Sequence, residues 1–190
     1  MLKVGITGPE SSGKTTLAKY LSNILNASYI PEYARLYLEE NGPIYTKDDV
    51  INIAHKQIEL ISSACSPIVI CDTECLVLNI WMDFKYQHTP VFVTDSIKNN
   101  ICDIYILCKP DIPWEDDILR ENPNDRDVLY NLYKQYLNNY NLNYSINSDY
   151  SSMYSVNTSY SNVNVTNGGL TTYNFPVTIV QNYNDIAVSM

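Results

Sequence analysis

The segment GPESSGKT, residues 8–15, constrains the fold more than any other part of the chain. It matches the pattern G-x-x-x-x-G-K-[S/T], in which the backbone N–H groups of a glycine-rich loop surround the phosphates of a nucleotide. Glycines are needed because side chains would block the close approach of a phosphate. An apolar run (3–8) precedes the segment, and a stretch with apolar residues at helical spacing (14–25) follows it. The sequence therefore predicts a strand, a phosphate-binding loop and a helix, in that order.

The residues of this loop have separate expected roles. The N-terminus of the following helix adds unpaired N–H groups and the positive end of the helix dipole. Lys14 is expected to span the β- and γ-phosphates of ATP as a catalytic cation, and the hydroxyl of Thr15 to ligate Mg²⁺. The predicted ATP contacts are Gly8, Pro9, Glu10, Ser11, Ser12, Gly13, Lys14, Thr15 and Thr16.

The chain up to residue 147 alternates between apolar runs and helical periodicities. Extended segments are expected at 27–35, 66–74, 102–110 and 142–147, and helices at 47–63, capped by Thr46, and at 125–140. This alternation predicts an α/β fold with a doubly wound, mostly parallel sheet flanked by helices. Ligands of such folds bind at the carboxyl ends of the strands. We expect residues 1–147 to form one P-loop domain.

The composition changes in residues 148–190, which contain no Lys or Arg and are rich in Ser, Asn, Thr and Tyr. Two alternating stretches flank Asn167-Gly168-Gly169. A β-hairpin and a disordered polar tail both agree with this pattern. We therefore separate 148–190 as an atypical polar C-terminal segment.

The composition indicates which classes of partner this chain can have and the state of its cysteines. With 12 basic and 21 acidic residues the formal net charge is -9, which argues against a protein that binds nucleic acid through its phosphates. The five cysteines form no C-x-x-C pair, which favours reduced thiols in the core. No apolar stretch approaches the roughly 20 residues of a membrane-spanning helix. The sequence predicts a cytoplasmic protein that acts on a small molecule, without nucleic acid or membrane partners.

Asp72 closes the apolar run IVICD (68–72). A carboxylate at the end of a buried parallel strand is what the Mg²⁺ site of a P-loop enzyme requires, so Asp72 is the candidate second metal ligand beside Thr15. The alternative is that Asp72 caps a turn or a helix formed by the segment LVLNIW (76–81).

The remaining residues favour a small kinase over other P-loop proteins. The guanine-recognition pattern N-K-x-D and the pattern D-x-x-G of GTPases do not occur, and ring-forming ATPases usually need a longer chain. A small kinase needs a base near the acceptor hydroxyl, an arginine over the transferred group and a lid that excludes water. Glu32 and Asp72 are both candidates for the catalytic base, and the sequence does not choose between them. Arg120 and Arg126 lie in the charged segment 111–127 expected to form the lid, where surface ion pairing is their alternative role.

Five motifs in the same order resemble a known family. They are GPESSGKTTL (8–17), PEYAR (31–35), IAHKQ (53–57), ICDTE (70–74) with Ile80-Trp81, and PDIPWEDDILRENPNDR (110–126). Together they resemble the NadR-type ribosylnicotinamide kinase domain, a P-loop NTPase of the AAA-type ATPase domain family, over residues 1 to about 142. The resemblance implies ATP- and Mg²⁺-dependent phosphorylation of the ribose 5′-hydroxyl of nicotinamide riboside to nicotinamide mononucleotide, a step of NAD salvage. The alternatives are another small P-loop nucleoside or nucleotide kinase and a nucleotide-binding regulatory module without turnover.

The implied substrate carries a cationic pyridinium ring, which aromatic faces bind well. The candidate aromatic residues are Tyr33, Trp81, Tyr86 and Trp114, with core packing as the alternative for each. The predicted substrate-binding set is Glu32, Tyr33, Arg35, Asp72, Trp81 and Trp114. The family would place an arginine-bearing final helix beside the adenine, where this chain has SDYSSMYSVN (148–157). This difference is the ground for expecting impaired activity and for the regulatory alternative.

Overall fold

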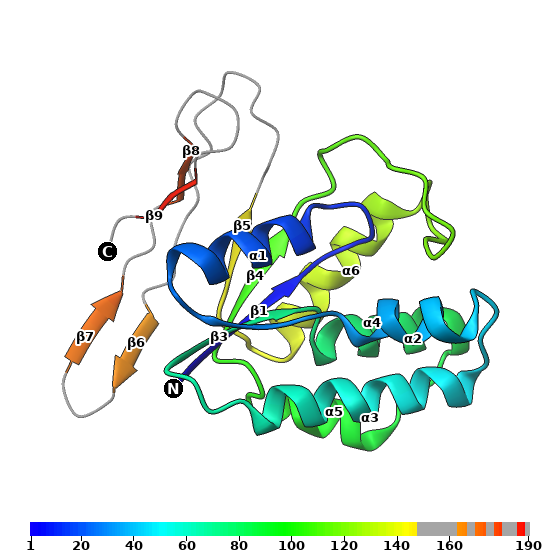
Figure 1. Ribbon diagram of the computed structural model, residues 1–190, viewed down its shortest axis with the longest axis horizontal. Coiled ribbons are helices and arrows are strands. Elements are labelled where there is room, and N and C mark those ends of the chain that lie inside the picture. The colour runs from blue at the N-terminus through cyan, green and yellow to red at the C-terminus, as the bar shows by residue number, and fades with distance from the viewer. Residues whose placement is uncertain (148–162, 167–169, 174–176, 180–185, 189–190) are drawn as a thin grey trace.

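The computed structural model describes residues 1–147 and four short strands beyond them, at 163–166, 170–173, 177–179 and 186–188 (Figure 1). Its main sheet has five strands, all parallel, in the order β2-β3-β1-β4-β5. The predicted parallel α/β fold is confirmed. The strands are β1 (Leu2–Thr7), β2 (Ser28–Ile30), β3 (Ile68–Asp72), β4 (Ile104–Cys108) and β5 (Tyr144–Asn147).

Helices cover both faces of this sheet. The helices are α1 (Lys14–Ile24), α2 (Tyr33–Asn41), α3 (Lys47–Ser63), α4 (Cys75–Tyr86), α5 (Val91–Lys98) and α6 (Arg126–Asn139). In Figure 1, α1 lies above the sheet and α3 and α5 lie below it. Val4 and Ile6 of β1 pack with Leu17 and Leu21 of α1 in one buried cluster. The opposite face of the sheet forms a second, larger cluster with α3, α4, α5 and α6. The alternation of side chains along each strand therefore builds two cores.

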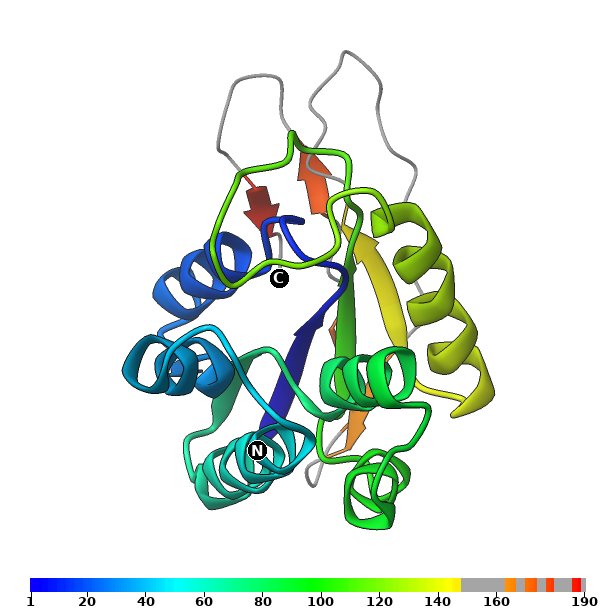
Figure 2. The same ribbon diagram turned by 90° about the vertical axis from the view of Figure 1, so that its right-hand side faces the viewer.

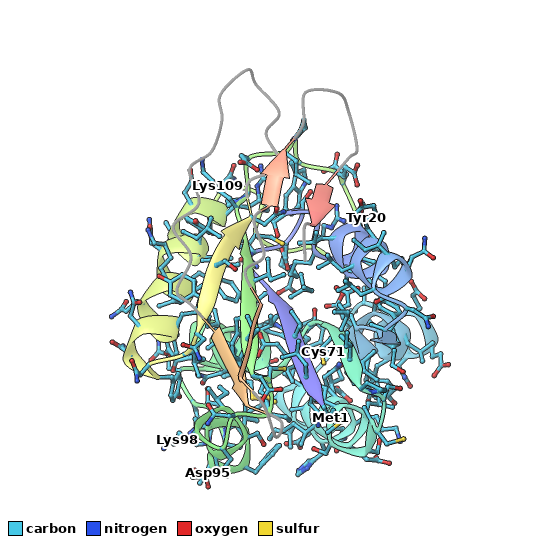
Figure 3. The ribbon with its side chains drawn as sticks, turned by 90° about the vertical axis from the view of Figure 1, so that its left-hand side faces the viewer. Met1, Tyr20, Cys71, Asp95, Lys98 and Lys109 are labelled. Carbon is cyan, nitrogen blue, oxygen red and sulfur yellow. The ribbon has the colours of Figure 1, made fainter. Side chains whose placement is uncertain are left out.

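The carboxyl ends of the parallel strands meet at one edge of the sheet. Figure 3 shows the molecule from the left-hand side of Figure 1, with Lys109 just beyond β4 at this edge and Met1 at the opposite edge. Asp72 at the end of β3 is in register with Ile6 of β1, directly before the glycine-rich loop. The fold thus brings the loop and the strand-end acids of the sequence together.

The segment 27–35 differs from its expected extended structure. Only Ser28–Ile30 is a strand, and α2 begins at Tyr33. The prediction was wrong for Tyr33–Arg35 because Pro31 restricts Ile30 but does not oppose a helix that begins after it. Ala34 and Leu38, four residues apart, then form the buried side of α2.

The helix predicted at 47–63 is confirmed together with its cap. The N–H of Asp49 donates to the hydroxyl oxygen of Thr46 (3.3 Å), and the N–H of Thr46 donates to the Asp49 carboxylate (2.7 Å). This is a capping box. Hydrogen bonds from the hydroxyls of Thr46 and Tyr37 lower the pKa of Asp49 to about 2.

Replacing Thr46 by alanine is expected to lower the free energy of unfolding by about 1 kcal/mol, because the first turn of α3 loses its side-chain acceptor. Urea denaturation measures this change. Thr94→Ala is the matched control, since the exposed Thr94 hydroxyl donates within its own helix, to the carbonyl of Val91. A Thr46→Ala protein as stable as the wild type would contradict the role of the cap.

Beyond residue 147, two antiparallel strand pairs are described. β6 (Val163–Thr166) pairs with β7 (Leu170–Tyr173), and β8 (Val177–Ile179) pairs with β9 (Ile186–Val188). The pairing of β6 with β7 is the one that a β-hairpin around Asn167-Gly168-Gly169 requires. The turn itself and residues 148–162 lie outside the described residues. The boundary between 1–147 and 148–190 stays a prediction. In the described part of the chain, every helix is too short or too polar to cross a bilayer.

Candidate active site

The glycine-rich loop between β1 and α1 forms a tight turn at the carboxyl edge of the sheet. Gly8 has φ +134°, and a Cβ atom there would lie 2.6 Å from the carbonyl oxygen of Cys108 at the end of β4. Only glycine fits this close approach. The hydroxyl of Ser12 and the ammonium of Lys14 both donate to the carbonyl of Pro9, each at 2.7 Å. Lys14 Nζ therefore lies beside the loop whose N–H groups are expected to bind phosphate.

Asp72 fits the role of a metal ligand. Its side chain is 1% exposed, and its Oδ2 accepts a hydrogen bond from the hydroxyl of Tyr29 (2.8 Å). Its Oδ1 is buried and has no hydrogen-bond partner among the described residues. A buried carboxylate oxygen without a donor is costly unless a cation or a water molecule binds it. Oxygen ligands such as Asp72 and the exposed hydroxyl of Thr15 are those that Mg²⁺ takes, so the residues fit this ion.

Glu32 precedes α2 and lies near both Lys14 and Asp72. Burial raises the pKa of its carboxyl group, Lys14 opposes this rise, and the negative charge of Asp72 adds to it. A carboxylate with a raised pKa is a better proton acceptor than an ordinary one. The two acids that the sequence could not separate therefore differ, since Glu32 lines a cavity, whereas Asp72 is buried and is not among the lining residues.

This cavity has a volume of about 360 Å³ and runs from the loop to α4. One end is formed by the loop residues 8–16, and Glu32 lies on its wall. The other end is mostly apolar and aromatic, with Leu38, Tyr45, Val77, Ile80, Trp81 and Phe84. We call these the phosphate end and the acceptor end.

The lid expected at 111–127 passes over the loop as part of the segment 109–125, except that Arg126 and Asp127 begin α6 (Figure 2, where the segment is green and the loop blue). The N–H groups of Glu121 and Asn122 donate to the carboxylate of Glu10, at 3.1 and 2.9 Å. The N–H of Glu115 donates to the hydroxyl oxygen of Ser11 at 3.1 Å. Glu10 and Ser11 thus hold the lid against the phosphate end.

The two arginines of the lid region have different positions. Arg120 lines the cavity and donates to the Ser11 hydroxyl (3.4 Å) and to the carbonyl of Glu115 (2.5 Å). Arg126 donates to the backbone carbonyls of Ser11 (2.7 Å) and Ile112 (3.0 and 3.1 Å), so it holds the lid and the loop together. Of the two, Arg120 lines the cavity and Arg126 does not.

Of the remaining predicted site residues, some line the cavity and the others lie in the lid or pack against the core. Trp81 and Arg35 line the cavity, and Arg35 is ion-paired with Asp117 of the lid (2.9 Å). Trp114 lies in the lid with the guanidinium groups of Arg120 and Arg126 5.9 and 5.8 Å from its ring centre. Tyr33 and Tyr86 pack against the core. Predicted residues outside the cavity lining are Tyr33, Asp72, Tyr86, Trp114 and Arg126.

Sequence reasoning missed two residues that line the cavity and one buried residue outside its lining. Tyr45 and Phe84 line the acceptor end, yet neither lies in a motif. Gln57, the last residue of IAHKQ, is buried and joins three segments, since it accepts from the N–H of Tyr33 and donates to the carbonyls of Pro31 and Thr73. A glutamine within the buried side of a helix was the available signal for this role.

Glu74, not Asp72, caps the helix formed by LVLNIW. Its carboxylate accepts from the N–H of Leu76 at 2.5 Å. Glu74 is fully buried, and burial raises its pKa to about 7 against the opposing effects of the Leu76 N–H and the Thr7 hydroxyl. At pH values between the ordinary pKa of a glutamate and 7, Glu74 is therefore protonated in the folded protein and ionised in the unfolded chain.

Glu74→Gln is expected to raise the melting temperature at pH 8 and to change it little at pH 5. Stability that the protonated Glu74 contributes is lost as the pH rises toward 7, because the folded state must then ionise a buried group. At pH 8 the free energy of unfolding of the variant is expected to exceed that of the wild type by on the order of 3 kcal/mol, since one pKa unit corresponds to about 1.4 kcal/mol. Thermal unfolding from pH 5 to 8 measures it, with Glu59→Gln as an exposed control. A difference that does not vary with pH would contradict the raised pKa.

The sequence matches known proteins over most of its length. Residues 3–151 match the family model described as an AAA domain. Two curated relatives, from Salmonella typhimurium (strain LT2) and Escherichia coli (strain K12), are both named trifunctional NAD biosynthesis/regulator protein NadR. Each is 29% identical over 150 residues, which are 74% of this chain and 37% of the relative. The chain thus spans little more than a third of the length of these relatives.

Solved structures share the fold. A NadR protein in complex with NR superposes with a TM-score of 0.59 at 21% identity, over 80% of this chain and 47% of that one. Deoxyadenosine kinase from M. mycoides superposes with a TM-score of 0.53 at 14% identity, over 77% of this chain and 89% of that one. The resemblance to NadR-type proteins is confirmed by the sequence matches. Since the family model covers most of the chain, the protein belongs to the AAA domain family of P-loop proteins and is a homologue of NadR.

Proposed function

We propose that this protein is a ribosylnicotinamide kinase, which transfers the γ-phosphate of ATP to the ribose 5′-hydroxyl of nicotinamide riboside. The observation that carries the proposal is the single cavity that joins the phosphate-binding loop to an aromatic acceptor end, with Glu32 on its wall. Homology to NadR supports the choice of substrate. The product, nicotinamide mononucleotide, would serve NAD salvage.

The residues of the phosphate end have complementary roles in this reaction. The loop N–H groups and Lys14 bind the β- and γ-phosphates, and Arg120 offsets charge that develops on the transferred group. Thr15 and Asp72 would hold Mg²⁺, which neutralises phosphate charge when bound. The lid, held by Glu10 and Ser11, excludes water that would otherwise compete with the acceptor.

Glu32 is the better candidate for the base. Its carboxylate lines the cavity and has a raised pKa, so it is placed to accept the proton of the acceptor hydroxyl. The carboxylate of Asp72 is almost fully enclosed, and one of its oxygens is taken by the Tyr29 hydroxyl. A metal role for Asp72 and a base role for Glu32 use both acids without conflict.

The acceptor end favours a nucleoside over a nucleotide. Its nearby cations, Arg35 and Lys85, are already ion-paired with Asp117 and Glu121, each at 2.9 Å. An acceptor phosphate would need to break one of these pairs. The ring of Trp81 instead offers aromatic surface, to which a pyridinium cation is attracted by about 0.5 to 2 kcal/mol per contact.

Calorimetric titration in the presence of Mg²⁺ and a non-hydrolysable ATP analogue tests the proposed substrate. Nicotinamide riboside is expected to bind, and nicotinamide mononucleotide, uridine and thymidine to bind much more weakly. Tighter binding of uridine, thymidine or a mononucleotide would favour another nucleoside or nucleotide kinase. Binding of the ATP analogue without any nucleoside would favour the regulatory module.

A further inference from the structure

Glu121 of the lid contacts both ends of the cavity. Its backbone N–H donates to the carboxylate of Glu10 in the phosphate-binding loop (3.1 Å). Its own carboxylate accepts from the hydroxyl of Tyr45 (2.8 Å) and from the ammonium of Lys85 (2.9 Å to each oxygen). One lid residue therefore joins the loop that binds phosphate to the residues around the acceptor end.

The hydroxyl of Tyr45 is the centre of this contact. It donates to Glu121 and accepts from the indole N–H of Trp81 (3.0 Å) and from Lys85 (2.7 Å). The Tyr45 and Trp81 rings meet edge to face with their centres 5.1 Å apart, and Lys85 Nζ lies 4.0 Å from the centre of the Tyr45 ring. Burial raises the pKa of Tyr45 to about 12, so the hydroxyl remains a donor at neutral pH. We call Tyr45, Lys85 and Glu121 the latch.

The latch joins segments that are far apart in the sequence. Tyr45 precedes α3, Lys85 lies near the end of α4, and Glu121 belongs to the lid. The side chains of Lys85 and Glu121 are 34% and 42% exposed. Ion pairs as exposed as this one are weak, so the latch can open in each catalytic cycle. Four hydrogen bonds among the latch residues and the contact of the Tyr45 and Trp81 rings nevertheless give the closed state a defined geometry.

We infer that Glu121 is a positioning residue that couples closure of the lid over the nucleotide to closure of the acceptor end by Tyr45 and Trp81. The inference rests on the proposed function insofar as it treats this end as the acceptor site. When a bound nucleotide orders Glu10 and the lid, it also holds Glu121 in position through the Glu10 contact. Glu121 in turn holds the Tyr45 hydroxyl in place beside Trp81. The two substrates then bind with positive coupling. Loss of the latch weakens acceptor binding and lets water compete for the phosphate.

Hydrogen exchange of residues 110–125 tests the latch without any acceptor. Addition of Mg²⁺ and the non-hydrolysable ATP analogue is expected to protect these backbone amides in the wild type and to protect them much less in Glu121→Ala and Tyr45→Phe. Glu121→Gln, which keeps an acceptor oxygen, is expected to restore most of the protection. Glu59→Ala is the matched control, since it breaks an ion pair of similar length on α3, Lys56–Glu59 at 3.0 Å. Equal protection in the wild type and both latch variants would overturn the inference.

Steady-state kinetics provide the second readout. Glu121→Ala and Tyr45→Phe are each expected to raise the KM for nicotinamide riboside by about tenfold, the equivalent of one hydrogen bond to a charged group. A comparable rise is expected in the KM for ATP at saturating nicotinamide riboside, because coupling between two sites is reciprocal. The double variant is expected to be little worse than either single variant, because both remove the same contact. Full additivity, or a change in only one of the two KM values, would overturn the inference. Loss of lid protection in the latch variants, without transfer to nicotinamide riboside in the wild type, would contradict only the proposed function.

Discussion

Lys14→Ala is expected to lower kcat/KM by about a thousandfold or more while leaving the protein folded. Lys14 Nζ donates to the Pro9 carbonyl beside the phosphate-binding loop, and its charge is the one expected on the β- and γ-phosphates. Its hydrogen bond lies within the loop, so little packing is lost with the side chain. Phosphate-transfer kinetics measure the first effect and thermal unfolding the second.

Lys19→Ala is the matched control for this experiment, because Lys19 is an exposed lysine on the same helix. It is expected to retain wild-type transfer and stability. Near wild-type activity of Lys14→Ala would contradict the assigned mechanism. Unfolding of Lys14→Ala, with Lys19→Ala intact, would show instead that Lys14 is structural.

Asp72→Asn is expected to lower kcat by about a hundredfold or more and to raise the Mg²⁺ concentration needed for half-maximal activity. The substitution keeps the shape of the side chain and an acceptor oxygen for the Tyr29 hydroxyl but removes the charge that would face the ion. Without Mg²⁺ the variant is expected to be at least as stable as the wild type, because the neutral amide avoids the cost of a buried negative charge. Activity measured across a magnesium titration, together with thermal unfolding in a chelator, tests both effects.

Asp95→Asn is the control for the loss of one negative charge, since Asp95 is exposed and 3.9 Å from Lys98 on α5. It is expected to change neither activity nor magnesium dependence. An unchanged magnesium dependence of Asp72→Asn would contradict a metal role for Asp72. Strong destabilisation would point to a structural role for its charge.

Local patterns predicted the parts of this fold that depend on local physics. The loop at 8–15 was recognisable because a backbone that wraps a phosphate needs glycine at set positions, and Gly8 indeed faces a backbone carbonyl too closely for any side chain. The start of α3 was readable because the capping box lies within four residues, Thr46 to Asp49. The buried strands were readable because parallel strands covered on both faces need continuous apolar runs.

The features that were not predicted depend on contacts between distant residues. The latch brings together Tyr45, Lys85 and Glu121, which no local pattern relates. Glu32 and Asp72 were equivalent in sequence because each was expected at the end of an extended segment. In the folded protein Glu32 lines the cavity, whereas Asp72 is enclosed and accepts a hydrogen bond from Tyr29. Trp114 was expected to contact the substrate because it is aromatic. Its position beside Arg120 and Arg126 depends on how the lid folds, which no local pattern predicts.

Turnover of ATP with nicotinamide riboside as acceptor tests the central proposal most directly, with uridine, thymidine and no acceptor as parallel controls. The proposal predicts rapid ATP consumption with nicotinamide riboside alone, with nicotinamide mononucleotide as the product and negligible turnover in the controls. Equal turnover with uridine or thymidine, or none with any acceptor although ATP binds, would contradict it.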